Sequence, residues 1–140
     1  MDWYHHKWFP RFFYKKNDGG VDSGVVGYFL IEWKPVFSIG ILSFDKGSRE
    51  NYHSHAFNAI TWWLSGKVEE INWKLPEDDK VYKPSIIPKL TLRSKIHKIF
   101  AYQKSWALTF RGPWKDTWFE VDKQDKMIQY THGRVKLPCQ

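Results

Sequence analysis

The chain contains a single cysteine, Cys139, close to its C-terminus. One cysteine cannot form an internal disulfide, so the sequence carries no sign of a secreted, disulfide-stabilised scaffold. The first residues are aromatic and charged and include Pro10, and they lack the apolar core of a signal peptide. No later apolar run is long enough to span a membrane. A cytoplasmic location is therefore expected, with no membrane partner.

Common catalytic signatures are also missing. The chain has no glycine-rich phosphate loop ending in lysine, no dinucleotide-binding fingerprint and no Gly-x-Ser-x-Gly elbow. No cysteine is placed with a histidine on a strand. Nucleophilic catalysis by a side chain is therefore not expected.

Alanine and leucine are scarce, and helical periodicity is hard to find beyond the N-terminal segment. Aromatic residues, in contrast, make up 19% of the 140 residues. Aromatic and β-branched residues favour strands. Short segments with strand character, separated by turn residues, occupy residues 26–33, 36–44, 96–102, 105–111, 117–121 and 127–131. We predict one all-β domain, a sandwich or barrel.

The N-terminal residues differ in composition from the rest. We expect an aromatic and basic arm over residues 1–24 and the barrel over residues 25–140. The stretch 3–16 could form a short amphipathic helix or an edge strand, interrupted at Pro10, and both alternatives remain open. Asn17-Asp18-Gly19-Gly20 then reads as a turn.

A His-x-His pair, His53 and His55, begins an apolar and aromatic run that extends to Gly66. Strand side chains alternate between faces, so both imidazoles are expected on one side, where they could grip a metal. His97, on another short alternating run, is the best candidate for a third ligand. The rival interpretation is a pair of histidines hydrogen-bonded in a core. The remaining histidines are expected at the surface: His5, His6 and His132.

The run ends in Leu64-Ser65-Gly66-Lys67, which predicts a tight hairpin. In that register Thr61 faces Glu70, and both share the side of the histidines. Glu70 is then either a fourth ligand or general base beside the metal, or a cross-strand salt-bridge partner. A carboxylate inside a barrel needs a cation or a hydrogen-bond donor, which favours the first interpretation.

The formal net charge of +7 raises the expectation of an anionic partner, a small anionic ligand or a nucleotide. The basic residues are scattered, so nucleic acid is only weakly indicated and solubility is the simpler explanation. Arg111 precedes Gly-Pro at a strand end, where it could anchor a carboxylate or phosphate, or lie on the surface against Trp114. Asn58 and Thr61 are further candidates for substrate binding, although Asn58 could simply cap a turn or bond the neighbouring strand.

These motifs resemble the cupins, whose first metal motif reads Gly-x5-His-x-His-x3,4-Glu-x6-Gly. Gly47, His53, His55 and Gly66 match it in order. The glutamate is missing, since neither Ala59 nor Ile60 is acidic, and the second motif around His97 is degenerate. The remaining pattern is similar to the three-histidine version of some thiol dioxygenase-like cupins.

A closer resemblance is to small cupin-like proteins of tailed bacteriophages. It covers residues 36–121 and rests on the following residues: His53, His55, Asn58, the 66–70 segment, His97, and the 109–113 segment with Trp114 and Trp118.

The resemblance implies a double-stranded β-helix with a divalent metal on His53, His55 and His97. Iron is the first expectation, and zinc, manganese or nickel would fit the same ligands. It implies a fold and a pocket more than a reaction. Our own hypotheses are a small-molecule oxygenase or isomerase with Glu70 as base, or else a non-catalytic module that sequesters a nucleotide or binds a host protein. Whether the protein is an enzyme stays open. A homodimer and a host-cytoplasmic location would also fit.

Overall fold

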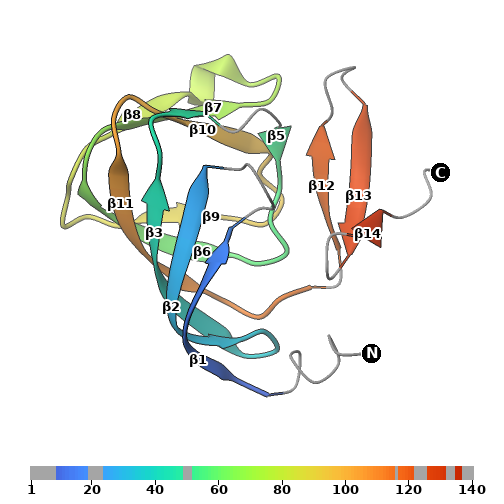
Figure 1. Ribbon diagram of the computed structural model, residues 1–140. Helices are drawn as coiled ribbons and strands as arrows, with labels where there is room; N and C mark the ends of the chain where they lie inside the picture. Colours follow the sequence, from blue (N-terminus) through green and yellow to red (C-terminus); the bar gives the residue numbers. More distant parts are fainter. Residues whose placement is uncertain are drawn as a thin grey trace.

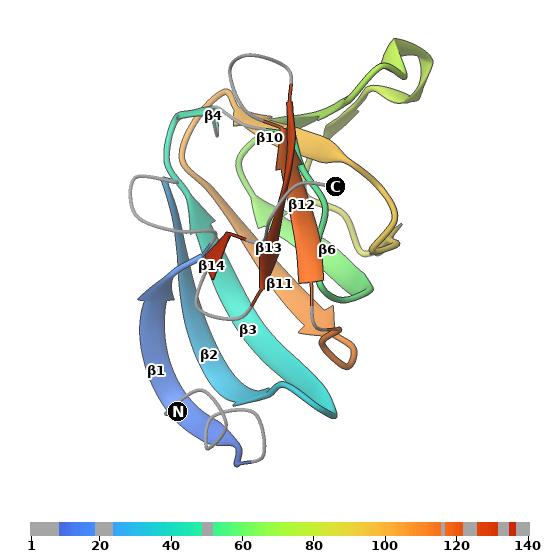
Figure 2. The same cartoon turned by 90° about the vertical axis from the view of Figure 1, so that its right-hand side faces the viewer.

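The computed structural model describes residues 9–18, 24–48, 52–115, 117–121, 126–131 and 135–136. Within these ranges the chain forms fourteen strands and one short 3₁₀-helix, η1 (Pro76–Asp78). The strands make two antiparallel sheets that face each other across a common interior (Figures 1 and 2). The predicted all-β jelly-roll architecture is therefore confirmed.

The first sheet has six strands. Their spatial order is β1 (Arg11–Asn17), β2 (Val25–Trp33), β3 (Phe37–Phe44), β11 (Ser105–Arg111), β6 (Ala59–Ser65) and β9 (Lys89–Thr91). Of the two conformations considered for the N-terminal stretch, residues 11–17 adopt the edge strand, which pairs with β2. Figure 1 shows this strand at the end of the sheet.

The second sheet has eight strands. Seven follow one path, β14 (Val135–Lys136), β13 (Met127–Thr131), β12 (Thr117–Val121), β5 (Tyr52–His53), β10 (His97–Ala101), β7 (Val68–Asn72) and β8 (Lys80–Tyr82), and β4 (Gly47–Ser48) pairs with β10. The strands β11, β12 and β13 have the bounds predicted from strand character and turn residues.

The interior contains many small and polar side chains. In β11, Ser105, Ala107, Thr109 and Arg111 are buried, while the residues between them are partly or fully exposed. Such a face cannot close into a dry, purely apolar core. It leaves a partly polar space between the two sheets.

The predicted hairpin between residues 64 and 67 is wrong. β6 pairs with β9 and β11, and β7 pairs with β8 and β10, so the chain passes from one sheet to the other at this point. Gly66 makes the crossing with a φ of +92°, and a Cβ there would lie 2.7 Å from the Cα of Ser105. Trp63 of β6 and Val68 of β7 are both buried and belong to one apolar cluster. The crossing is favoured because it places these two side chains on facing sheets, where both are buried.

The single strand predicted from residue 52 onward is also divided. β5 ends at His53 in the eight-stranded sheet, and β6 begins at Ala59 in the six-stranded sheet. Ser54 stays attached to the eight-stranded sheet, since its backbone N–H donates to the Phe119 carbonyl of β12 at 2.8 Å and its hydroxyl accepts from the Phe119 N–H at 2.9 Å. The following residues cross the interior.

Within the described residues no helix is long and apolar enough to cross a membrane. The histidines expected at the surface and the single cysteine lie outside the described residues: His5, His6, His132 and Cys139.

Candidate metal centre and its cavity

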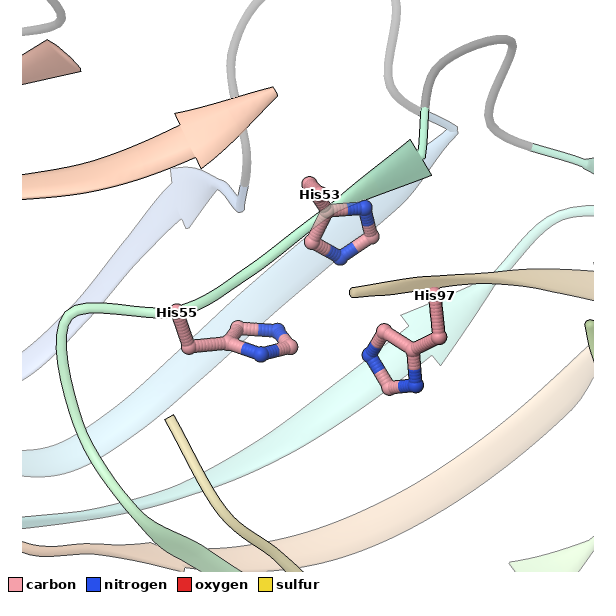
Figure 3. Close-up of side chains that lie close together, drawn as sticks. All are labelled: His53, His55 and His97. Atoms are coloured by element: carbon pink, nitrogen blue, oxygen red, sulfur yellow. The ribbon is translucent and has the colours of Figure 1, made fainter. Parts of the chain in front are cut away.

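Three histidines converge between the sheets. His53 ends β5, His97 begins β10, and the two are register partners across these strands. His55 follows on the crossing segment. The ring centroids lie 4.9 Å (His53–His55), 5.2 Å (His53–His97) and 5.2 Å (His55–His97) apart. Figure 3 shows the three rings turned toward one another. The structure thus brings together the three predicted ligands. His53 and His55 come from one part of the chain and His97 from another.

The donor set fits a divalent metal. One nitrogen from each ring lies within 4.8 Å of the other two. Metal-to-imidazole bonds of about 2.1 Å place two ligands of one ion at most about 4.2 Å apart, so small ring rotations complete such a site. His53 and His97 are buried and His55 is half-buried, which leaves the site reachable from one side.

Glu70 orients one of the rings. Its carboxylate lies 2.5 Å from His97 Nδ1, which leaves Nε2 of that ring for a ligand bond. A carboxylate behind a histidine in this way holds the tautomer and direction that a metal ligand needs. Glu70 therefore lies beside the triad, although the β6–β7 pairing used to predict this position is wrong.

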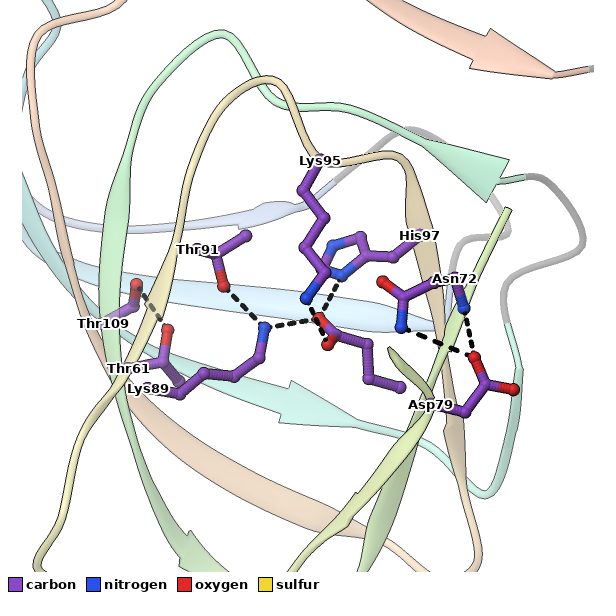
Figure 4. A network of polar contacts seen from close by, with 9 residues as sticks. Thr61, Asn72, Asp79, Lys89, Thr91, Lys95, His97 and Thr109 are labelled. Atoms are coloured by element: carbon purple, nitrogen blue, oxygen red, sulfur yellow. Dashed lines mark hydrogen bonds and ion pairs between the residues drawn. The ribbon is translucent and has the colours of Figure 1, made fainter. Parts of the chain in front are cut away.

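Two lysines converge on the same carboxylate. Lys89 Nζ donates to Glu70 Oε2, and Lys95 Nζ lies 2.9 Å from Oε1 (Figure 4). Burial alone would raise the pKa of Glu70, but the hydrogen bond from His97 and the charge and hydrogen bond of Lys89 outweigh it, so the pKa stays below its ordinary value. Glu70 is ionised, with Oε2 hydrogen-bonded to His97 and Lys89 and Oε1 ion-paired with Lys95.

Burial has the opposite effect on the bases around Glu70. It lowers the pKa of His97, and the neighbouring carboxylate offsets this only in part. Burial also lowers the pKa of Lys89. A neutral His97 at physiological pH is the form that coordinates a metal.

A strip of hydroxyls continues from Lys89 along the inner wall. Lys89 Nζ donates to Thr91 Oγ1 at 2.6 Å, and Thr61 and Thr109 have their hydroxyls 3.4 Å apart (Figure 4). Thr61 is the register partner of Lys89. The predicted substrate residue Thr61 thus lines the cavity within a polar strip.

The cavity has a volume of about 290 Å³. Its apolar lining includes Val25, Leu42, Phe44, Trp63 and Ile99 on one part of the wall and Phe57, Trp114 and Trp118 on another. Its charged residues are Lys16, Asp18, Lys34, Lys89, Arg111 and Glu120. A space of this size suits a small molecule with both apolar and polar groups.

Arg111 is buried rather than on the surface, so the alternative of a surface arginine is wrong. Its guanidinium donates two hydrogen bonds to the Asp18 carboxylate, at 3.1 and 2.6 Å. It also lies 5.1 Å from the Phe29 ring centroid and 4.5 Å from that of Phe57. Gly40 leaves room for this stack, because a Cβ there would be 2.7 Å from the Phe29 ring. Arg111 lines the cavity, but its charge is already paired.

Asn58 lies outside the cavity. Its side chain is exposed, and its Oδ1 accepts a hydrogen bond from the Arg93 backbone N–H at 2.7 Å. Its own carbonyl accepts from the Gly112 N–H at 2.8 Å. These contacts join three connecting segments, so the structure separates Asn58 from the other predicted site residues.

Sequence reasoning missed several cavity residues. Asp18, Lys34, Lys89 and Glu120 line the cavity without belonging to any motif. Lys89 and Thr91 alternate as a strand does, which was a weak signal for a shared inner face. Asp18 meets Arg111 across 93 positions of sequence, and no local pattern reports such a contact.

No protein-family model matches the sequence, and comparison with curated proteins gives no match either. Solved structures do resemble it. An RmlC-like cupin from Ralstonia eutropha JMP134 has a TM-score of 0.61 at 14% identity, over 84% of this chain and 73% of that one. An acetylacetone dioxygenase from Acinetobacter johnsonii has a TM-score of 0.58 at 16% identity, over 87% and 78%.

A sugar phosphate isomerase of the cupin superfamily from Silicibacter pomeroyi has a TM-score of 0.60 at 9% identity, over 89% of this chain and 87% of that one. At these identities the likeness establishes the fold. The protein has the cupin fold, and its histidine triad could hold a metal.

Proposed function

We propose that the protein is a metal-dependent member of the cupin superfamily, an oxygenase or isomerase that acts on a small anionic substrate. The observation that carries this proposal is the triad itself, with three imidazole nitrogens within 4.8 Å of one another beside a cavity. His53, His55 and His97 would hold the ion, with iron the first choice. Bound there, a divalent metal keeps its positive charge and open positions, and so polarises a small ligand or activates water or O₂.

The residues of the chain supply orientation around that ion. Glu70 holds His97, and Lys89 and Lys95 hold Glu70. Because these three partners surround the Glu70 carboxylate, its contacts support an orienting role better than that of a general base. Lys89 and the threonine hydroxyls offer hydrogen-bond donors to a ligand in the cavity.

Metal analysis tests the proposal. Protein purified without chelators is expected to contain metal in stoichiometric amount, and His53→Ala combined with His97→Ala is expected to remove it. Glu69→Gln is a suitable control, since Glu69 lies one residue from Glu70 and bonds the exposed Tyr102 hydroxyl instead. Metal-free wild-type protein with an intact fold would refute the metal-dependent activity.

A second candidate is a non-catalytic module that binds a nucleotide or another anion. It is favoured by Lys34, which lines the cavity without an ion-pair partner among the described residues and would attract an anion even without a metal. The other cations of the cavity wall are already paired: Lys16, Lys89 and Arg111. The resemblance to phage proteins would place such a module in phage–host conflict. An unaltered ligand recovered from purified protein, with no turnover on incubation, would support this candidate over the enzyme.

A further inference from the structure

Lys34 lies just after β2 and lines the same cavity as the histidines. Its backbone carbonyl accepts a hydrogen bond from the Trp114 N–H at 2.7 Å. Its ammonium lies 4.6 Å from the centroid of the Trp114 ring. These contacts fix a half-buried cation at the wall of the cavity.

Within the described residues, no carboxylate pairs with Lys34. The acidic residue whose charge it senses, Glu32, is taken by two other groups. Lys16 Nζ lies 2.7 Å from Glu32 Oε2, and the Tyr14 hydroxyl donates to Oε1. Among the described residues Lys34 thus has no ion-pair partner of its own, and a ligand that supplied an anion would stabilise this half-buried cation.

Lys16 adds a second cation at the same indole. Its ammonium lies 5.4 Å from the Trp114 centroid. Two like charges near one aromatic ring repel each other, and an anion between them would relieve that repulsion. Lys16 is itself paired with Glu32, as Arg111 is with Asp18 and Lys89 with Glu70, so Lys34 is the cation of the described cavity wall that has no ion-pair partner.

Aromatic rings connect Lys34 to the histidines. The ring centroids of Trp114 and Phe57 are 5.2 Å apart, and those of Phe57 and His55 are also 5.2 Å apart. All of these residues line the cavity. A flat, apolar group could lie along this wall with one end at the histidines and the other at Lys34.

We propose that Lys34, with Lys16 beside it, binds the oxyanion of the ligand, a carboxylate or a phosphate, while the flat apolar body of the ligand lies along Trp114 and Phe57. The inference rests on the proposed function for the histidine end of the ligand. It assigns to Lys34 the anchoring role that the sequence had assigned to Arg111.

Calorimetric titration with three probes tests the assignment. The probes are benzoate, phenyl phosphate and benzyl alcohol, which share a ring and differ in the anion. Lys34→Met keeps an unbranched stem on Trp114 and removes only the charge. Lys83→Met removes one charge from an exposed lysine that does not line the cavity.

Wild-type protein is expected to bind at least one of the two anions more tightly than benzyl alcohol. Lys34→Met is expected to weaken that anion at least about tenfold, which corresponds to about 1.4 kcal/mol, and to leave benzyl alcohol unchanged. The tighter of the two anions identifies the natural group. Anion affinity that stays within twofold in Lys34→Met, falls equally in Lys83→Met, or is absent in the wild type overturns the inference.

Metal content measured in the same samples separates this inference from the proposed function. Lys34→Met is expected to retain the metal of the wild type, because Lys34 is not among the candidate ligands. Selective anion binding by a metal-free wild type would refute the metal-dependent activity and uphold the Lys34 site. Bound metal in a protein that does not discriminate between the anions and the alcohol would refute the Lys34 site and would leave the metal centre supported.

Discussion

Glu70 is the residue on which most contacts of the candidate site depend. It is fully buried and bonds one histidine and two lysines at once. Its removal would loosen His97 and would leave Lys89 and Lys95 without their counter-charge. A single substitution there therefore affects both metal binding and stability.

We predict that Glu70→Gln lowers metal affinity about 10- to 100-fold, the usual effect of losing a group that orients a ligand. Titration of chelator-treated protein with metal measures it. Glu69→Gln, one residue away and bonded to Tyr102, is expected to bind metal like the wild type. Unchanged affinity in Glu70→Gln would show that His97 does not need this contact.

The ion pair between Asp18 and Arg111 is predicted to make the protein less stable in acid. Burial alone would raise the pKa of Asp18, but the charge and hydrogen bonds of Arg111 outweigh burial and hold the pKa well below the ordinary value of 3.8. As the pH falls below that value, the unfolded chain takes up a proton before the folded protein does. The stability from this pair, complete at neutral pH, is therefore lost progressively as the pH falls from 3.8 toward the lower folded pKa.

Urea unfolding between about pH 7 and pH 3 tests this expectation. Asp18→Asn should lower the free energy of unfolding at neutral pH by on the order of 2–3 kcal/mol, because it leaves the buried Arg111 unpaired. In Asp18→Asn the free energy of unfolding should also fall less steeply as the pH is lowered. Asp45→Asn, in an exposed pair 3.8 Å from Lys104, should change little. A wild-type curve that keeps its value down to about pH 3 would contradict the assignment.

The sequence predicted residue identities better than residue roles. The His-x-His spacing identified His53 and His55, and a short alternating run identified His97. These local patterns were sufficient because all three side chains point into the interior. The role of Arg111 was not accessible in the same way. Its partner Asp18 lies 93 positions away, and the choice between ligand and carboxylate depends on tertiary packing.

At the scale of elements, the crossing from β6 to β7 is the point where local pattern and observed pairing disagree. Strand character and flanking turn residues predicted the bounds of β11, β12 and β13, and burial alternates along β11. These patterns do not report whether two consecutive strands pair or face each other across the interior. The same limitation explains why residues 52–65 were predicted as one strand although they belong to two sheets.

We predict that Gly66→Ala destabilises the protein more than Gly47→Ala. Both glycines have a positive φ, +92° and +115°, so both substitutions strain the backbone by about 1–2 kcal/mol. Only at Gly66 would the new Cβ meet another backbone, at 2.7 Å from Ser105 Cα, whereas nothing lies within 4 Å at Gly47. Thermal and urea unfolding compare the two variants. Equal losses would mean that the backbone at Ser105, at the start of the neighbouring strand β11, moves aside at little cost.

At the scale of the whole molecule, a metal held by His53 of β5, His55 of the β5–β6 connection and His97 of β10 would link distant parts of the chain. A ligand that binds only the folded state stabilises it by about 2.7 kcal/mol at a hundredfold excess over its Kd. For a domain of this size that corresponds to a rise in Tm of roughly 5–10 °C.

We therefore expect added metal to raise the Tm of chelator-treated wild-type protein, and His53→Ala to abolish this rise. Differential scanning calorimetry with and without excess metal measures both. The control Glu69→Gln should show the wild-type shift. A rise of the same size in His53→Ala would mean that the ion binds elsewhere.

Because His53 and His97 are register partners on β5 and β10, the geometry of the triad also depends on the register of these two strands. Successive side chains point to opposite faces, so a slip of one position would turn a ring away from its companions. A coloured ion such as Co²⁺, supplied while denatured chains refold, would then acquire its bound absorption only in molecules whose strands have met in native alignment. The centre proposed for chemistry would thus report, by its absorption, when β5 and β10 reach their native register during refolding.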